Sequence, residues 1–379
     1  IPRNPVPQCF AILYADGRVD LFARDGKTDA ILDHLGAEVT VRGEEAFVPA
    51  LGALGGAVLI DPNTCPQIIG ETLPNPVEGH DPCVLPKACK NPTEIAGART
   101  AHLRDAVAMC RFLHWLDEAG AITEIDVVTQ LEQFRAETGA LRDISFDTIA
   151  GSGPNGAVIH YRVTHDTNRQ LQEGDLLVLD SGGQYQDGTT DITRTIAIGT
   201  VGAEERACYT RVLQGMIAIS RARFPNGVTG AHLDSLARFP LWTAGLDFDH
   251  GTGHGVGSYL CVHEGPQRLS RVSDIPLRPG MVLSNEPGYY RAKAFGIRIE
   301  NLIVVQPAPP IAGGDAHRNH LSFETLTWVP LDRRLIDLTL LSRDEVSWID
   351  SYHATVLDKV GANLDAAAKH WLEQACAPL

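Results

Sequence analysis

Long apolar runs are absent from the sequence, and aromatic residues are scarce. No apolar run approaches the roughly 20 residues that a membrane-spanning helix requires. Aromatic side chains make up only 6% of the 379 residues, but apolar residues make up 44%, which is enough for a sizeable core. No charged and then apolar leader opens the chain, and it begins with Ile1 rather than Met, so we expect that something upstream has been removed.

Basic residues are too few to balance the acidic ones. The chain has 32 Lys and Arg residues against 47 Asp and Glu residues, which gives a formal net charge of −15. Nucleic acids and anionic membranes both bind basic faces, so neither is expected as a partner. Much of the excess is most simply a solvated acidic surface.

The cysteines form no CxxC pair and show no regular spacing. Most of them lie among apolar or helical neighbours, as Cys110 does. The eight are Cys9, Cys65, Cys83, Cys89, Cys110, Cys208, Cys261 and Cys376. Free thiols are typical of a reducing compartment, so we predict a cytoplasmic protein.

Residues 1–86 are typical of a small α/β domain without catalytic residues. Asp16-Gly17 predicts a hairpin turn between strands at 10–14 and 18–22. A helical piece near 29–35 and a buried strand at 57–60 follow. The Pro-rich segment 73–92 predicts a linker.

Two helices are predicted after the linker. Asn91, Pro92 and Glu94 have the spacing of an N-cap, a first helical residue and a capping box, and the apolar pattern continues to about Glu118. A second helix is expected at 124–138, after Thr123. A Gly-rich loop then leads into a strand at 157–161 that ends near His160.

The C-terminal part is predicted to contain strands and then helix. Residues 302–305 and 323–330 read as strands, and 342–377 have helical periodicity. Trp348 and Trp371 in that helical stretch indicate either a subunit interface or ordinary core packing.

An internal sequence repeat suggests that the chain contains two copies of one unit of helix and strands. Four residues recur 106 positions later, with a carboxylate retained at the third place. The first set is Leu171, Gly174, Asp180 and Gly182, and the second is Leu277, Gly280, Glu286 and Gly288. Gly-rich loops also precede both His160 and His263. We therefore expect two similar units that face each other, although strand and turn patterns also recur by chance.

Carboxylates and one imidazole at the ends of strand-like segments predict a metal site. The five are Asp180, Asp191, His254, Glu286 and Glu300. Two metals about 3.5–4 Å apart need bridging ligands, and carboxylates can bridge where imidazole cannot. Oxygen donors with a single His and no thiolate favour Mn²⁺ over structural Zn²⁺, although Co²⁺ or Zn²⁺ could also bind.

Each of these residues also has a structural interpretation. Asp180 and Asp191 could cap turns, and Glu286 could form a salt bridge. Glu300 could pair with Arg298 or Arg194, and His254 could mark only a tight turn between glycines. The glycines at 251, 253, 255 and 257 alternate and do not have the spacing of a dinucleotide-binding fingerprint.

The motifs around these residues resemble the pita-bread metallopeptidases, and among them the cytosolic, eukaryotic-type aminopeptidase P. The likeness extends from about Asn4 to the C-terminus. It rests on Asp180 to Thr195, His250 to Gly257, Val262 to Pro266, Asn285 to Tyr290 and Phe295 to Asn301. The resemblance implies an α+β pita-bread catalytic domain with an internal pseudo-two-fold repeat, preceded by a smaller α/β domain.

The resemblance also implies an activity and residue roles. The expected reaction is removal of an N-terminal residue when proline is second, by a hydroxide that bridges two divalent metals. The five donors are then the ligands, and Glu286 also takes a proton from the bridging water. His263 is similar to the histidine that stabilises the oxyanion, His160 and His250 to those that line the substrate pocket, and Arg298 to an arginine that braces the ligands.

Three regions follow from the resemblance. Residues 1–86 match the family's non-catalytic domain, 87–310 the catalytic domain, and 311–379 a C-terminal extension used for dimerisation. Relatives carry a further α/β domain before the point where this chain begins, so a truncated or proteolysed product is expected. Two alternatives stay open: a prolidase that acts on Xaa-Pro dipeptides, and a non-catalytic binding module on the same fold.

Overall fold

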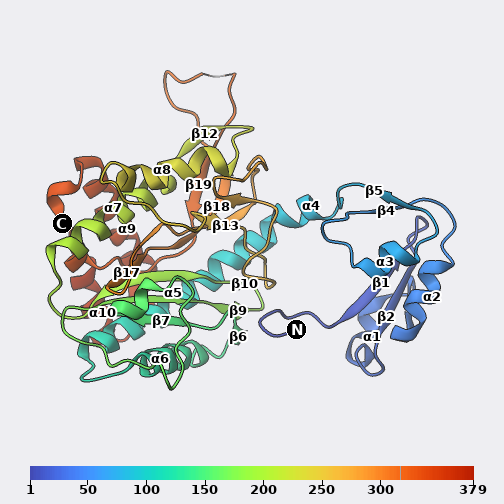
Figure 1. Ribbon diagram of the computed structural model, residues 1–379, viewed down its shortest axis with the longest axis horizontal. Helices are drawn as coiled ribbons and strands as arrows, with labels where there is room; N and C mark the ends of the chain where they lie inside the picture. Colours follow the sequence, from blue (N-terminus) through green and yellow to red (C-terminus); the bar gives the residue numbers. More distant parts are fainter. Residues whose placement is uncertain (316) are drawn as a thin grey trace. The chain divides into compact units, whose positions relative to one another are not determined.

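The computed structural model describes residues 1–315 and 317–379 and divides into two compact units (Figure 1). One unit comprises Ile1–Pro86 and the other Lys87–Leu379. Residues 319–379 therefore belong to the same compact unit as all five predicted metal ligands.

The first unit is a small mixture of short strands and helices. Its three-stranded sheet has the order β1-β2-β3, with β1 and β2 antiparallel and β2 and β3 parallel. The elements are β1 (Cys9–Leu13), β2 (Val19–Ala23), α1 (Leu32–Leu35), β3 (Val39–Arg42), α2 (Phe47–Gly52), β4 (Val58–Ile60), α3 (Gln67–Thr72), β5 (Pro76–Glu78) and α4 (Val84–Ala88). The predicted hairpin at Asp16-Gly17 is confirmed, because it joins β1 to β2.

One prediction for this unit was wrong. The strand at 57–60 is not buried, since Leu59 in β4 is 52% exposed, and the core of the unit gathers instead around Phe22 and Phe47. The Pro-rich segment 73–92 contains the boundary between the two units, as expected of a linker, and it also contains β5, α4 and the beginning of the next helix.

The second unit carries its strands between long helices. In Figure 1, α7 and α8 lie on one side of these strands and α6 on the other. The helices are α5 (Pro92–Glu118), α6 (Glu124–Ala136), α7 (Ala203–Ser220), α8 (Gly230–Trp242), α9 (Arg343–Val360) and α10 (Ala366–Ala375). The strands up to residue 225 are β6 (Leu141–Ile144), β7 (Ile149–Ser152), β8 (Leu176–Ser181), β9 (Gly183–Tyr185), β10 (Gly188–Thr189), β11 (Ile192–Ala197) and β12 (Arg223–Pro225). The later strands are β13 (Gly253–His254), β14 (Arg268–Leu269), β15 (Val282–Asn285), β16 (Gly288–Arg291), β17 (Phe295–Arg298), β18 (Asn301–Pro307) and β19 (His320–Thr325).

The two predicted helices are confirmed, and each begins at a capping box. The Asn91 side chain accepts from the Glu94 backbone N–H at 2.9 Å, and Glu94 accepts from the Asn91 backbone N–H at 2.9 Å. Thr123 and Asp126 make the same reciprocal pair at the beginning of α6. Each pair satisfies backbone donors that the first helical turn leaves without a partner.

Antiparallel sheets bring the acidic segments together. In the sheet β11-β8-β7, Asp180 pairs with Thr193, so Asp180 and Asp191 lie at the same end of the ladder. In the sheet β12-β19-β18-β15, Asn285 pairs with Asn301, which places Glu286 beside Glu300.

The internal sequence repeat has a structural counterpart in the turns. Gly174 precedes β8 with a φ of +89°, and Gly280 precedes β15 with a φ of +88°. Thr123 forms an isolated bridge with Gln170, and Thr229 forms one with Pro276. The helices α6 and α8 begin directly after these two threonines, so helix, turn and strand recur at the same spacing.

Several predicted boundaries in this unit differ from the structure. His160 does not end a strand, because Gly153–Ala157 form a 3₁₀ helix and residues 158–161 contain a turn. The strand predicted at 323–330 is β19, which ends at Thr325. The helical stretch 342–377 is broken into α9 and α10, with a 3₁₀ turn at Gly361–Asn363.

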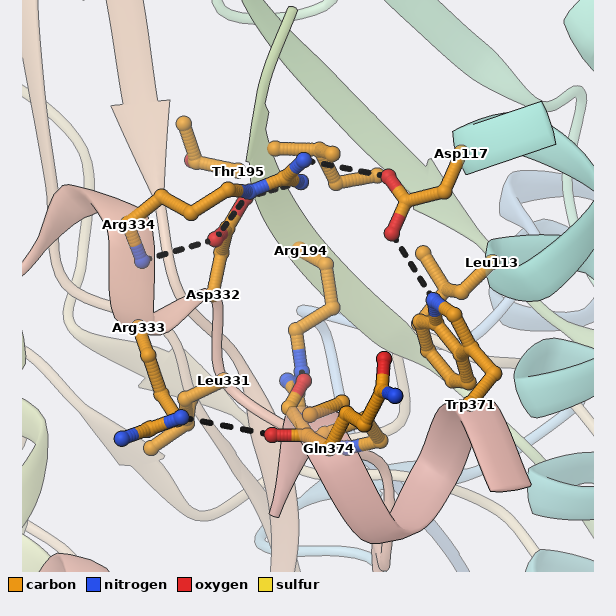
Figure 2. A pocket seen from close by; sticks show the side chains of 13 residues that line it. Leu113, Asp117, Arg194, Thr195, Leu331, Asp332, Arg333, Arg334, Trp371 and Gln374 are labelled. Carbon is orange, nitrogen blue, oxygen red and sulfur yellow. Dashed lines mark hydrogen bonds and ion pairs between the residues drawn. The ribbon is translucent and has the colours of Figure 1, made fainter. Parts of the chain in front are cut away.

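The C-terminal tryptophans pack against the core rather than project from the surface. Trp371 donates its indole N–H to Asp117 at 2.8 Å, and Asp117 also pairs with Arg334 at 3.1 Å (Figure 2). Trp348 stacks on Tyr352 with ring centroids 5.2 Å apart. Both side chains are partly buried and pack against the core, as one of the two interpretations expects. A small cavity of about 240 Å³ is lined by Asp117, Arg194, Arg334 and Trp371, among other residues.

The cysteines are free thiols, but the expectation that they are buried holds for only three of the eight, Cys110, Cys208 and Cys376. Among the helices of the described residues, none combines the length and apolar character that crossing a membrane would take.

Candidate metal centre

The five predicted ligands converge from five separate segments. Asp180 lies in β8 and Asp191 directly precedes β11, while His254 ends β13. Glu286 lies between β15 and β16, and Glu300 lies between β17 and β18. Ligand atoms of Asp191, His254 and Glu300 lie within 4.8 Å of one another. His254 Nε2 is 3.4 Å from Asp191 Oδ2 and 3.4 Å from Glu286 Oε1.

The carboxylates of the cluster have buried oxygens that no protein hydrogen bond satisfies. Asp180 Oδ2 accepts a hydrogen bond from Arg298, and Glu300 Oε2 accepts one from Thr193. Three other carboxylate oxygens are buried and have no hydrogen-bond partner among the described residues: Asp180 Oδ1, Asp191 Oδ1 and Glu300 Oε1. Buried polar atoms in native proteins are almost always satisfied. Carboxylate oxygens in this arrangement fit divalent cations, which take oxygen ligands and neutralise their charge.

The electrostatics of the cluster agree with this assignment. Burial, and then the charges of Asp180 and Glu286, raise the pKa of Asp191 well above its usual value. Burial and then the charge of Asp191 do the same for the pKa of Glu300. Several buried carboxylates this close can all be ionised at neutral pH only if positive charge lies among them.

His254 has a hydrogen bond that fixes its tautomer. Its Nδ1–H donates to the Gly255 carbonyl at 3.0 Å, which leaves the Nε2 lone pair facing Asp191 and Glu286. A ligand histidine is typically oriented in this way by a hydrogen bond from its other ring nitrogen. The His263 ring meets the His254 ring edge-on, with centroids 4.3 Å apart.

A chain of hydrogen bonds joins Arg298 to His250. Arg298 Nη1 donates to the Tyr290 hydroxyl at 2.6 Å, and Tyr290 donates to His250 Nε2 at 3.0 Å, because His250 Nδ1–H already donates to the Gly251 carbonyl. Burial, and then the Arg298 charge, lower the pKa of His250 to about 3. His250 is therefore a neutral imidazole at physiological pH. Sequence reasoning quoted Tyr290 within a motif but gave it no role.

Sequence reasoning also missed the pair that supports the segment before His254. Asp234 and Arg238 are both nearly fully buried on α8, and Arg238 Nε donates to Asp234 Oδ2 at 2.7 Å. Arg238 also donates to the carbonyls of Phe248 and His250, and Thr252 donates to Asp234. The available signal was an Asp and an Arg four residues apart on a mainly apolar helix.

The metal centre lies in a cavity of about 650 Å³. Besides the donors Asp180, Asp191, His254 and Glu286, its wall contains His160, His250, His263, Arg298, Phe146 and Val272. All the predicted site residues except Glu300 line this cavity, and Glu300 is buried behind it. Burial, and then the neighbouring His254, lower the pKa of His263 to about 4, so this imidazole is also neutral.

The loop that carries His160 is organised by the buried carboxylate of Glu124. Glu124 accepts hydrogen bonds from the Ser152 backbone at 2.7 Å and from the Tyr161 hydroxyl at 2.9 Å. Asn155 and the backbone of Arg169 donate to the same carboxylate. Glu124 therefore fixes both ends of the loop, and a lone Glu at the first position of a helix gave no sign of this in the sequence.

Comparison with known proteins agrees with this geometry. Residues 96–307 match the profile of metallopeptidase family M24. The chain belongs to metallopeptidase family M24. Residues 1–94 match the creatinase/prolidase N-terminal domain, and residues 319–379 match the C-terminal region of the M24 peptidases.

Curated M24 relatives are similar over most or all of the chain. Aminopeptidase P1 from Lotus japonicus is 44% identical over 350 residues, which covers 84% of this chain and 53% of the relative. Aminopeptidase P2 from Arabidopsis thaliana is 40% identical over 424 residues, which covers 100% of this chain and 59% of the relative. The chain thus spans a little more than half the length of these relatives.

Solved M24 structures share the fold. An X-prolyl aminopeptidase from Caenorhabditis elegans, described as a cytosolic enzyme with a di-nuclear active site, superposes with a TM-score of 0.92 at 33% identity, over 100% of this chain and 64% of that one. The prolidase from Pyrococcus horikoshii gives a TM-score of 0.68 at 27% identity, over 83% and 86%. The predicted α+β pita-bread fold with a preceding smaller domain is confirmed.

Proposed function

We propose that this chain binds two divalent metal ions and hydrolyses the peptide bond between an N-terminal residue and a proline in second position. The observation that carries the proposal is that Asp180, Asp191 and Glu300 each have a buried carboxylate oxygen with no hydrogen-bond partner among the residues that the structure describes. Relatives named aminopeptidase P support the substrate class, and the di-nuclear Caenorhabditis elegans enzyme supports two ions.

The donor set favours Mn²⁺, and Co²⁺ or Zn²⁺ are ions that the same oxygens and imidazole also accept. We assign Asp180 to one ion and His254 with Glu286 to the other. Asp191 and Glu300 are the residues assigned to both ions. When bound, such ions lower the pKa of water and polarise the substrate carbonyl.

The chain's own side chains supply the remaining chemistry. Glu286 accepts a proton from the attacking water, with its Oε1 held by the Ser284 hydroxyl at 2.9 Å. His263, as a neutral imidazole, donates its N–H to the carbonyl oxygen as negative charge develops there. His160 and His250 line the substrate pocket. The prolyl nitrogen carries no N–H, so recognition depends on ring shape and on the free amino terminus.

The test is release of the first residue from a Xaa-Pro-Pro peptide by the purified protein with added Mn²⁺. The matched control is Asp191→Ala, which removes one of the carboxylates assigned to both ions. Turnover by the unsubstituted protein that is lost in Asp191→Ala supports the proposal. Equal rates for the two proteins, or no turnover by either, would refute it.

A prolidase is the second candidate, because solved prolidases share this fold. Comparing a Xaa-Pro dipeptide with the corresponding tripeptide separates the two activities, since a dipeptidase requires that proline carry the free C-terminal carboxylate. A non-catalytic binding module is disfavoured, because all five donor positions are filled, four of them line one cavity, and Glu300 lies within 4.8 Å of Asp191 and His254.

We also propose a cytoplasmic homodimer. The free thiols support the compartment. The C-terminal extension was the predicted interface, but among its described residues the exposed large apolar side chains are Ile311 and Leu338, which are 27 positions apart in the chain. Leu236, Phe239 and Trp242 of α8 are 42%, 63% and 44% exposed and follow one another at intervals of three residues, so α8 is the better candidate surface.

A further inference from the structure

A buried ion pair joins the beginning of α5 to the loop that carries His263. Lys90 Nζ donates to Glu264 Oε1 at 2.6 Å, although the two residues are 174 positions apart. Their side chains are only 3% and 7% exposed. Lys90 Nζ also donates to the Lys87 carbonyl at 2.8 Å. Buried charges of this kind persist only when they are paired and hydrogen-bonded.

The backbone of Lys90 is fixed as firmly as its side chain. Its N–H donates to the Gly280 carbonyl at 2.9 Å. A Cβ at Gly280 would lie 2.5 Å from the Lys90 carbonyl oxygen, so only glycine permits this approach. Gly280 begins the turn into β15, the strand that ends next to Glu286. Lys90 is thus anchored to the strand that delivers one predicted ligand.

Glu264 lies where the two histidines of the site meet. Its backbone N–H donates to the Gly255 carbonyl at 2.8 Å, and that same carbonyl accepts from His254 Nδ1 at 3.0 Å. His263 directly precedes Glu264, and its ring packs edge-on against His254. Because His263 is the chain neighbour of Glu264, a shift of the Glu264 carboxylate would move the backbone of His263.

We propose that Lys90 is a positioning residue, which acts through Glu264 to hold the His263 side chain in the cavity. This inference rests on the proposed function, because it concerns the donor that His263 offers to the reacting carbonyl. A donor that matters mainly in the transition state changes kcat when it is misplaced and leaves KM nearly unchanged. Lys90 itself touches neither the substrate nor the reacting atoms.

Lys87 provides a matched control on the same carboxylate. Its Nζ lies 3.0 Å from Glu264 Oε2, but its side chain is 54% exposed. Exposed ion pairs are screened by solvent and contribute little. The structure therefore assigns the positioning role to the buried lysine and not to the exposed one.

The experiment compares Lys90→Met with Lys87→Met in the Xaa-Pro-Pro assay. For Lys90→Met we expect kcat to fall by about 100-fold, because small displacements of catalytic groups have effects of this size. KM and the metal content per chain should stay at the unsubstituted values. Lys87→Met should change kcat by less than about twofold.

A cycle with His263→Ala separates positioning from a general structural effect. If Lys90 acts through His263, Lys90→Met has little further effect in the His263→Ala background. An equal loss of kcat in both backgrounds overturns the inference and leaves the proposed activity intact. Absence of turnover by the unsubstituted protein overturns both.

Lys90→Met leaves the buried Glu264 carboxylate with only the exposed Lys87 as its charged partner, which can prevent folding. The double variant Lys90→Met with Glu264→Gln removes both charges and keeps the volume of the pair. If it folds and binds metal, we expect kcat to stay low, because the link to the His263 loop is lost. A kcat equal to that of the unsubstituted protein in this variant overturns the inference.

Discussion

Arg298 Nη2 donates to Asp180 Oδ2 at 2.6 Å, while Asp180 Oδ1 has no partner among the described residues. The guanidinium is nearly fully buried and also donates to the Tyr290 hydroxyl and the Ile159 carbonyl. One oxygen of the carboxylate is thus held by protein, and the other is directed into the cluster of donors. At Glu300, likewise, the Thr193 hydroxyl donates to Oε2, and Oε1 has no partner among the described residues.

Replacing Arg298 should weaken metal binding. Lysine has a single nitrogen in place of the planar guanidinium whose Nη1 and Nη2 reach different partners, so Arg298→Lys leaves Asp180 poorly oriented. We expect metal affinity to fall by about 10- to 100-fold, as for other residues that orient metal ligands. Titration of the metal-free protein with Mn²⁺ measures this. Arg291→Lys is the control, because Arg291 is half-exposed and pairs with Glu204 outside the cavity; affinities that match for all three proteins would contradict the prediction.

Asp191→Asn should have opposite effects on stability with and without metal. In chelator, the substitution removes one of several buried, mutually repelling carboxylates, so we expect the free energy of unfolding to rise by about 1 kcal/mol. In Mn²⁺, the variant loses a ligand and should be less stable than the unsubstituted protein. Thermal unfolding under both conditions measures the sign. Asp187→Asn is the control, since Arg104 already neutralises Asp187, and it should show no gain in chelator.

Two glycines of one motif should differ sharply in their tolerance of alanine. A Cβ at Gly253 would overlap the Ser284 carbonyl oxygen, which belongs to the strand beside His254. At Gly251 the nearest atoms are 3.3 Å away, so a methyl group needs only small adjustments. We expect Gly253→Ala to lose about 2 kcal/mol or more of stability, as overpacked sites do, together with metal binding. Denaturant unfolding of both variants tests this, and equal midpoints would show that the close approach is unimportant.

Acid should destabilise the chain partly through His353. Burial lowers the pKa of His353 to about 4, and its Nε2 accepts from the Leu331 backbone N–H at 3.1 Å. The unfolded chain takes up a proton near pH 6.5, whereas the folded protein resists protonation until about pH 4. The stability contributed by this group is therefore complete above pH 6.5 and is lost as the pH falls towards 4, by roughly 3 kcal/mol in total.

Replacement by glutamine keeps an acceptor for Leu331 and removes the titration. His353→Gln should flatten the fall in unfolding free energy between pH 6.5 and 4, as measured by denaturant titration across that range. His370→Gln is the control, because that side chain is 71% exposed. The prediction fails if both variants follow the same pH dependence as the unsubstituted protein.

A charge on α8 should separate the proposed dimer. Phe239→Glu places a carboxylate on the exposed apolar residues of α8, whereas Leu338→Glu does the same in the C-terminal extension. Burying an unpaired charge in an interface is strongly unfavourable. We expect sedimentation analysis to show monomer for Phe239→Glu and dimer for Leu338→Glu; the reverse result would return the interface to the C-terminal extension.

Some features could be read from local sequence because local interactions decide them. The capping residues Asn91 and Thr123 determine where two helices begin, and Asp16-Gly17 determines a hairpin. The spacing of glycine and carboxylate in the internal sequence repeat reflects two turns, at Gly174 and Gly280, with nearly the same positive φ. These predictions succeeded because the interacting groups are only a few residues apart.

Other predictions failed where long-range packing decided the outcome. His160 was expected at the end of a strand, but hydrogen bonds to Glu124 draw this loop into a 3₁₀ turn. Leu59 was expected in the core and is exposed, because the core of its unit forms around Phe22 and Phe47. For Trp371 the sequence left core packing and a subunit interface open, and the structure shows it hydrogen-bonded to Asp117, a partner 254 positions away.

By itself, the sequence determined which donors are available: Asp180, Asp191, His254, Glu286 and Glu300, in motifs with the glycines that permit close approach. The tertiary structure decided which oxygens are free, that Arg298 orients Asp180, and that Lys90 reaches Glu264. The reason is that ligand type is a property of each residue, whereas distance and orientation depend on how strands more than a hundred positions apart pack together.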